Sequence, residues 1–212
     1  QLQPLFVRHE NFVARTGNPY YWVRAISETA KSIFESRQPE LLSFAKGLLQ
    51  KGLTHEPSNR LLWNQLGLAL KFLHHEQAAE WVFWEGIRRD PEQVAHYTEL
   101  GRLLKDGGRH EEAEEVFREA FRIDPKDIPS RTELGRLLMR MDRLAEAETM
   151  FREILAIDAH DSYAMRWIKM LSQARQWTAE ERRARLAGVT TEDHPELTET
   201  QETAGATVED AP

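Results

Sequence analysis

Hydrophobic residues in the central part of the chain recur at helical spacing. The spacing i, i+3, i+7 occurs twice in succession, first at Trp63, Leu66 and Leu70 and then at Tyr97, Leu100 and Leu104. Residues spaced in this way lie on one face of an α-helix, so each series predicts an amphipathic helix. The second series follows the first by 34 residues. A fixed period of this length predicts repeated helical units that stack on one another.

Three units starting at Arg60, Val94 and Ile128 share more than this apolar stripe. The recurring positions are Leu66-Gly67, Leu100-Gly101 and Leu134-Gly135, then Ala79, Ala113 and Ala147, then Phe83, Phe117 and Phe151. The first two units end with Asp90-Pro91 and Asp124-Pro125. This pattern resembles the tetratricopeptide repeat family. The resemblance implies an all-α, right-handed superhelical solenoid of helix-turn-helix units, in which small residues let paired helices approach closely.

The chain divides around these units. A weaker unit precedes them, in which Pro39 begins the second helix and Pro57 corresponds to Pro91. The predicted organisation is an aromatic segment at 1–24 docked on the first helices, a degenerate repeat at 25–59, repeats at 60–93, 94–127 and 128–161, capping helices at 162–187 and a disordered acidic tail at 188–212.

Net charge separates the tail from the rest of the chain. The 212 residues carry a formal charge of −7, and from Gly188 onward there are seven acidic residues and no Lys or Arg. The preceding part carries 28 acidic and 28 basic residues. A neutral body argues against nucleic-acid binding, which needs a basic excess to neutralise phosphates. The tail lacks apolar periodicity, which predicts disorder.

Other features bear on compartment. The absence of Cys excludes disulfides but does not separate cytoplasm from periplasm, and no apolar run is long enough to span a membrane. Because the chain starts at Gln1 rather than Met, we expect that an upstream segment, such as a signal peptide or anchor, has been removed.

Catalytic chemistry has no candidate residues. His74, His75 and His110 fall in or beside the turns between paired helices, where neighbouring side chains diverge rather than converge on a metal. The metalloprotease, phosphate-loop and nucleophile-elbow motifs are absent. We therefore expect no enzyme activity, no metal site and no cofactor.

The resemblance implies a concave groove lined by the first helix of each unit. Its partner-binding positions, transferred one residue at a time, are Asn64, Gln65, Leu68, Lys71 and Phe72, then Thr98, Glu99, Arg102, Lys105 and Asp106, then Thr132, Glu133, Arg136, Met139 and Arg140. Five cations against three anions favour an extended or acidic protein segment as ligand. Exposed groove charges would contribute little to folding. The alternative is that the glutamates pair with arginines along each helix.

The groove lacks one known pattern of this family. Co-chaperones of heat-shock proteins clamp a C-terminal carboxylate with Lys and Asn, whereas the matching positions here are Asn64, Leu68, Glu99, Pro129 and Glu133.

Trp81 and Trp84 depart from the repeat on the opposite, convex side. The next units have Glu115 and Arg118 at these positions, which are expected to be solvated. The two Trp side chains therefore need a partner, which is either the aromatic N-terminal segment or another protein.

The function predicted from these observations is a non-catalytic scaffold or adaptor that holds another protein in its groove. The alternatives are a regulatory or substrate-docking domain of a larger enzyme, a membrane-anchored assembly factor, and a self-associating structural subunit.

Overall fold

The computed structural model describes residues 19–36 and 39–174, which form α-helices joined by short turns. The helices are α2 (Pro19–Ser36), α3 (Pro39–His55), α4 (Arg60–Phe72), α5 (Glu76–Arg89), α6 (Val94–Asp106), α7 (His110–Ile123), α8 (Ile128–Arg140), α9 (Leu144–Ile157) and α10 (Ser162–Ala174). The expected all-α solenoid is confirmed. Helix α2 starts before the expected position near Ala25. The N-terminal segment 1–18, the last capping helix and the acidic tail lie outside the described residues.

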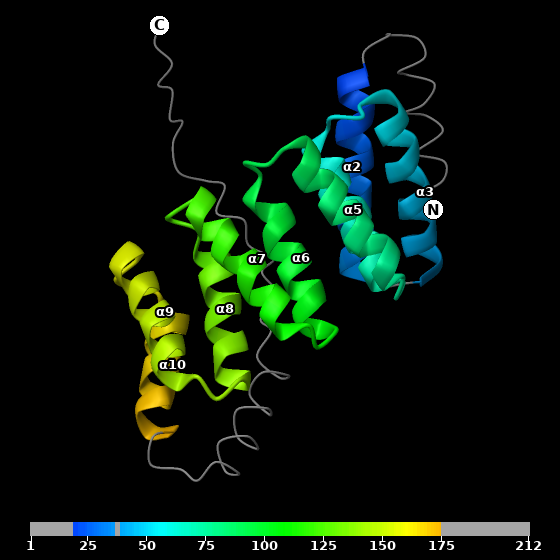
Figure 1. Cartoon of the computed structure of the whole chain (residues 1–212). Helices are drawn as coiled ribbons and strands as arrows, with labels where there is room; N and C mark the ends of the chain where they lie inside the picture. Colours follow the sequence, from blue (N-terminus) through cyan, green and yellow to red (C-terminus); the bar gives the residue numbers. More distant parts are fainter. Residues whose placement is uncertain (1–18, 37–38, 175–212) are drawn as a thin grey trace, which may run out of the picture.

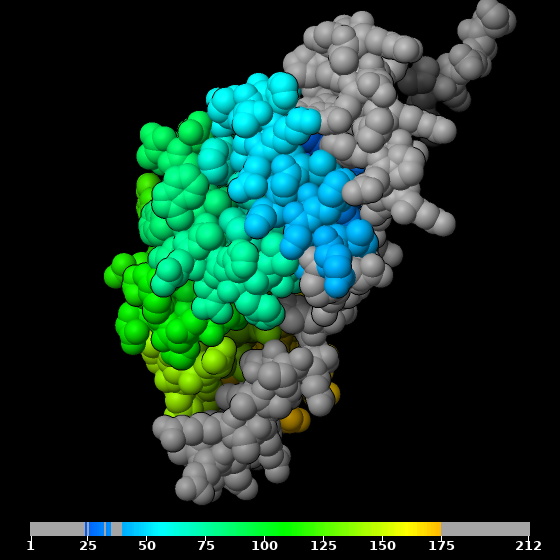
Figure 2. Space-filling model, turned by 90° about the vertical axis from the view of Figure 1, so that its right-hand side faces the viewer, coloured from blue at the N-terminus to red at the C-terminus, as the bar shows by residue number. Residues whose placement is uncertain are grey.

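Consecutive helices pack as antiparallel hairpins, which stack in chain order (Figure 1). The pairs are α2 with α3, α4 with α5, α6 with α7 and α8 with α9, and α10 packs on α9. In addition, the first helices contact one another, α2 with α4, α4 with α6 and α6 with α8. In the side view of Figure 2, the blue and cyan helices lie at one end of the stack and the yellow helices at the other. The first helices therefore line one side.

The turn inside each unit requires one left-handed backbone conformation. His74 has φ 57°, Gly108 has φ 78° and Asp142 has φ 58°, and these three positions are one repeat period apart. Only Gly adopts this conformation without steric cost, although Asp and His tolerate it better than most residues. This repeated turn geometry directs the second helix back along the first in each of these three units.

A phenylalanine fills the space beside the repeated glycine. A Cβ added to Gly101 would lie 2.4 Å from Cε1 of Phe117, whose side chain is fully buried. The same arrangement joins Gly67 to Phe83 and Gly135 to Phe151. The glycine is therefore needed because a ring from the second helix occupies its side-chain space. The sequence-based explanation, close approach of two backbones, omitted this ring.

A second glycine of the unit, Gly52 or Gly86, makes room for a side chain from the first helix of the next unit. A Cβ on Gly52 would lie 2.8 Å from Cδ1 of Leu62, and a Cβ on Gly86 would lie 2.8 Å from Cε1 of His96. Leu62 and His96 occupy the same position in successive units, and both are fully buried. Neither ring nitrogen of His96 has a hydrogen-bond partner. Burial lowers the pKa of His96 to about 4, although Asp90 acts in the opposite direction.

We expect His96→Leu to remove part of the acid sensitivity of the fold. The unfolded chain binds a proton at His96 below about pH 6.5, whereas the folded chain binds it only near pH 4, so unfolding free energy falls over this interval. Between pH 7 and pH 5 the wild type should lose about 1–2 kcal/mol more than the variant. Leu62 over Gly52 shows that leucine fits this position. Urea denaturation at both pH values provides the measurement, and equal losses would contradict the prediction.

Candidate functional site

The predicted groove positions lie on α4, α6 and α8, but they differ in exposure. Arg140, Phe72 and Asp106 are exposed; Asn64, Leu68, Lys71, Glu99, Arg102 and Thr132 are half-buried; Gln65, Thr98, Lys105, Glu133, Arg136 and Met139 are buried. The charged groove positions Lys105, Glu133 and Arg136 are therefore not exposed, although the sequence analysis treated the groove charges as exposed.

Glu133 lies at the centre of a buried ion network that joins α6 to α8. Its carboxylate pairs with Nζ of Lys105, and it accepts a hydrogen bond from Nε of Arg102 at 3.2 Å. Arg136 lies 3.5 Å from the same carboxylate, and Arg102 also pairs with Glu99. Burial raises the pKa of Glu133, but the three cations outweigh it and lower the pKa to about 2. The expected pairing along each helix is present, and it is extended across helices.

The charged residues paired with Glu133 contribute to the stability of the fold. Lys105 has a side chain only 8% exposed, and burial lowers the pKa of its ammonium group despite the neighbouring Glu133. The expectation that groove charges contribute little to folding applies to exposed pairs and not to this network. Because most of these cations are already paired with glutamates, their excess over the anions no longer favours an acidic ligand.

Other polar groove positions connect neighbouring first helices. The amide nitrogen of Gln65 donates to Oγ of Ser27 at 2.9 Å, which links α4 to α2. The hydroxyl groups of Thr98 and Ser130 are 2.8 Å apart and link α6 to α8. Lys71 pairs with Asp106 at 3.0 Å, which links α4 to α6. These contacts hold the groove helices in register.

Two of the predicted groove positions on α4, Asn64 and Gln65, have a buried side-chain oxygen without a hydrogen-bond partner. Oδ1 of Asn64 is buried without a hydrogen-bond partner, and Phe72 is 40% exposed beside the half-buried Leu68. The ring of Phe72 also lies 5.9 Å from that of Phe34, measured between centroids. We call Asn64, Leu68, Lys71 and Phe72 the α4 groove surface. It combines a hydrogen-bond acceptor, apolar area and a cation.

On the other side of the stack, both predicted tryptophans are exposed. Trp81 is 62% exposed and Trp84 is 48% exposed. Trp81 packs edge-on against Trp63, with 6.3 Å between ring centroids. Of the segment 1–24 that was expected to cover this pair, residues 1–18 fall outside the described part of the chain, and residues 19–24 form the start of α2.

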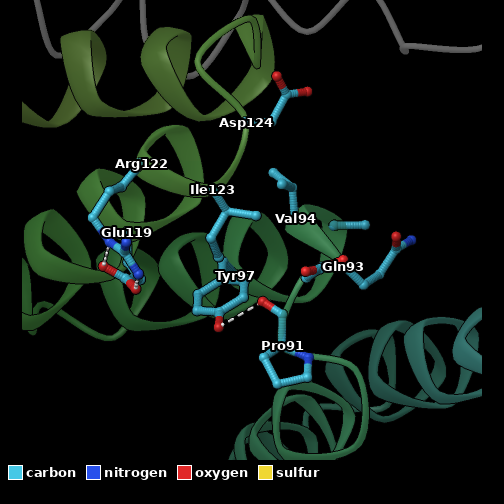
Figure 3. Close-up of a pocket in the computed structure, with 10 residues that line it drawn as sticks. Pro91, Gln93, Val94, Tyr97, Glu119, Arg122, Ile123 and Asp124 are labelled. Carbon is cyan, nitrogen blue, oxygen red and sulfur yellow. Dashed lines mark hydrogen bonds and ion pairs between the residues drawn. The ribbon is translucent and has the colours of Figure 1, made fainter.

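Sequence reasoning missed a pocket of about 780 Å³ at the α5–α6 turn and the end of α7. Figure 3 shows Tyr97, Glu119 and Ile123 on its walls. The phenolic Oη of Tyr97 donates to the carbonyl of Pro91 at 3.0 Å, and burial raises the pKa of this phenol. A comparison of the units could have indicated this pocket, because Ile123 stands where the preceding unit has the longer side chain of Arg89.

Among the described residues there is no cluster of three or more potential metal ligands. None of the described helices has the length and apolar character needed to cross a membrane.

The geometry agrees with comparisons to known proteins. Residues 103–165 match the family model for the tetratricopeptide repeat. Residues 103–165 therefore belong to tetratricopeptide repeats. Members of this family are in general non-catalytic interaction modules. Comparison with curated proteins gives no significant match.

Solved tetratricopeptide repeat structures share the fold at low sequence identity. PilF from Pseudomonas aeruginosa is 16% identical, with 82% of this chain and 77% of that chain covered and a TM-score of 0.64. YrrB, described as having an unusual peptide-binding site, is 15% identical over 87% and 93% of the two chains, with a TM-score of 0.58. The first repeat domain of Spaghetti (RPAP3), bound to an HSP90 peptide, is 16% identical over 56% and 94%, with a TM-score of 0.51. These identities show a shared fold alone.

Proposed function

We propose that this tetratricopeptide repeat protein is a non-catalytic scaffold that holds an extended segment of another protein in its concave groove. The observation that carries the proposal is the α4 groove surface, where Oδ1 of Asn64 lacks a partner and Phe72 is exposed about two helix turns further on. A buried acceptor without a donor is costly, and a backbone N–H of an extended segment would satisfy it. Two structures with the same fold are described with a bound peptide or a peptide-binding site, which supports this mode of recognition.

The arrangement of charges refines the ligand. Glu133 neutralises the cations in the middle of the groove, so an acidic segment would find its available cations at Arg140 and, in competition with Asp106, at Lys71. Apolar side chains of the segment would contact Leu68 and Phe72. We therefore propose a ligand that combines at least one apolar side chain with flanking carboxylates.

We expect the double substitution Asn64→Ala and Phe72→Ala to reduce partner capture at least tenfold. Phe72 is 40% exposed and its ring also contacts Phe34, so the midpoint of thermal unfolding should fall only modestly. The measurement is quantitative capture of proteins from cells of the source organism, with a photo-crosslinking residue placed at position 68. Glu115→Ala with Thr149→Ala provides the matched control on exposed positions of the second helices. Equal capture by both double variants would contradict groove recognition.

A further inference from the structure

In the unit that starts at Arg60, the guanidinium group of Arg89 is held by other residues of the chain. The guanidinium of Arg89 lies over the ring of Trp63, 4.9 Å from its centroid. It donates to the carboxylate of Glu85 at 2.7 Å and to the backbone carbonyl of Pro57 at 3.1 Å. The same carbonyl accepts a hydrogen bond of 2.8 Å from the indole nitrogen of Trp63. An aromatic face, a carboxylate and a turn carbonyl thus surround one arginine.

One repeat later, the surroundings recur without the arginine. Tyr97 supplies the ring, Glu119 the carboxylate and Pro91 the carbonyl, but Ile123 stands at the position of the arginine. Tyr97 repeats the hydrogen bond to the turn, donating from Oη to the Pro91 carbonyl at 3.0 Å. A carbonyl oxygen has two lone pairs, so this acceptor retains capacity for a second donor.

The carboxylate of Glu119 in the second unit can also accept a further hydrogen bond. In the first unit Glu85 accepts hydrogen bonds from both Arg88 and Arg89. Its counterpart Glu119 accepts hydrogen bonds from Arg122 only, within the part of the chain that the structure describes. The side chain of Glu119 is 40% exposed, compared with 14% for Glu85. Accordingly, one of the two guanidinium groups found in the first unit is missing in the second.

The third unit fills the corresponding place in another way. Arg131 replaces the aromatic residue, and its Nε lies 3.3 Å from the carboxylate of Glu153, the counterpart of Glu119. Its NH1 group donates at 3.0 Å to the carbonyl of Asp127, two residues after the counterpart of Pro91, and its guanidinium lies over the ring of Phe121. The first and third units thus each place one of their own guanidinium groups against the repeated glutamate, Glu85 and Glu153. In the second unit, no described arginine besides Arg122 is paired with the corresponding Glu119.

The space left in the second unit is the pocket of about 780 Å³ shown in Figure 3. Three carboxylates line it, from Glu92, Glu119 and Asp124, against the single cation of Arg122. We propose that this pocket binds an arginine side chain of a partner protein, which takes the position that Arg89 occupies in the preceding unit. A planar guanidinium can donate to Glu119 and to the turn carbonyl at once, which the compact ammonium of lysine matches less well. The site is separate from the α4 groove surface, so the proposal stands independently of groove recognition.

The test is a titration of the full chain with the capped peptide acetyl-Ala-Arg-Ala-amide, observed by NMR at the backbone amides around the pocket. The uncharged citrulline peptide provides the ligand control. We expect saturable shifts at Gln93 and Val94 in the millimolar range with arginine, and at least tenfold weaker binding with citrulline. Glu119→Gln should weaken arginine binding to a similar degree, because the carboxylate is lost.

Ile123→Arg provides the decisive variant, because it restores the internal arginine of the first unit. We expect this variant to lose binding of the arginine peptide while its unfolding midpoint stays at or above that of the wild type. Ile157→Arg is the matched control, since it makes the same change in the third unit, where Arg131 already fills the place. The control should bind the peptide like the wild type. The proposal is overturned by equal binding of arginine and citrulline, by absence of binding, or by unchanged binding in Ile123→Arg.

Discussion

Replacing Glu133 with alanine is expected to lower the free energy of unfolding by about 3–5 kcal/mol. The substitution removes the anion that faces Lys105 and Arg136, whose side chains are each only 8% exposed. Removing one partner of a buried ion network is strongly destabilising, because the remaining charges stay out of water without compensation. Urea denaturation at pH 7 monitored by circular dichroism provides the measurement.

A surface ion pair supplies the control for this effect. Glu112 binds Arg109 with two hydrogen bonds, but its side chain is 55% exposed. Glu112→Ala should therefore leave the unfolding midpoint nearly unchanged, because Arg109 is partly solvated and keeps its ion pair with Glu80. In the Glu133→Ala background, Lys105→Met should recover part of the lost stability, since it removes one of the uncompensated charges. Equal effects of Glu133→Ala and Glu112→Ala would show that the network contributes no more than a surface pair.

The same network predicts an acid response with a defined direction. The pKa of Glu133 is about 2 in the folded chain, below its ordinary value of 4.5. Its contribution to stability is therefore complete above pH 4.5 and is lost as the pH falls toward 2. Wild type and Glu133→Ala should become more similar in stability across this interval.

The periodicity predicted the helices and their stacking because both depend on local spacing. The recurrence of Leu-Gly and Phe every 34 residues is sufficient to place the paired helices of each repeat. Pro39 likewise marked the start of α3, since proline is tolerated in the first turn of a helix. Such features require no knowledge of how one unit is rotated on the next.

The charges of the groove depend on that rotation, and the sequence pattern does not contain it. Lys105 stands near the end of α6 and Glu133 near the middle of α8, so their positions within the repeat differ. Only the offset between adjacent helices brings the two side chains together. Pairing between Arg102 and Glu99 was predictable, because residues at i and i+3 share a helix face. Because of these pairs between α6 and α8, most of the cations that were expected to bind a ligand are neutralised by glutamates of the same chain.

Gly101→Ala is expected to lower the free energy of unfolding by about 2–3 kcal/mol, although alanine is the better helix former. The added Cβ would lie 2.4 Å from Cε1 of Phe117 and within 2.8 Å of two further ring atoms. Phe117 is fully buried, so the ring can move only by displacing its neighbours in the core. Urea denaturation measures the loss in unfolding free energy, and circular dichroism of the native variant measures any change in helix content.

Gly47→Ala is the matched control, because Gly47 also lies within a helix and nothing lies within 4 Å of its added Cβ. This variant should gain about 0.5–1 kcal/mol from helix propensity. Phe117→Leu tests the mechanism directly, since a smaller side chain makes room for the methyl group of Gly101→Ala. The double variant should be more stable than the sum of the two single losses predicts. Similar responses at the two glycines, or strictly additive losses in the double variant, would show that the phenylalanine ring does not set the requirement for glycine.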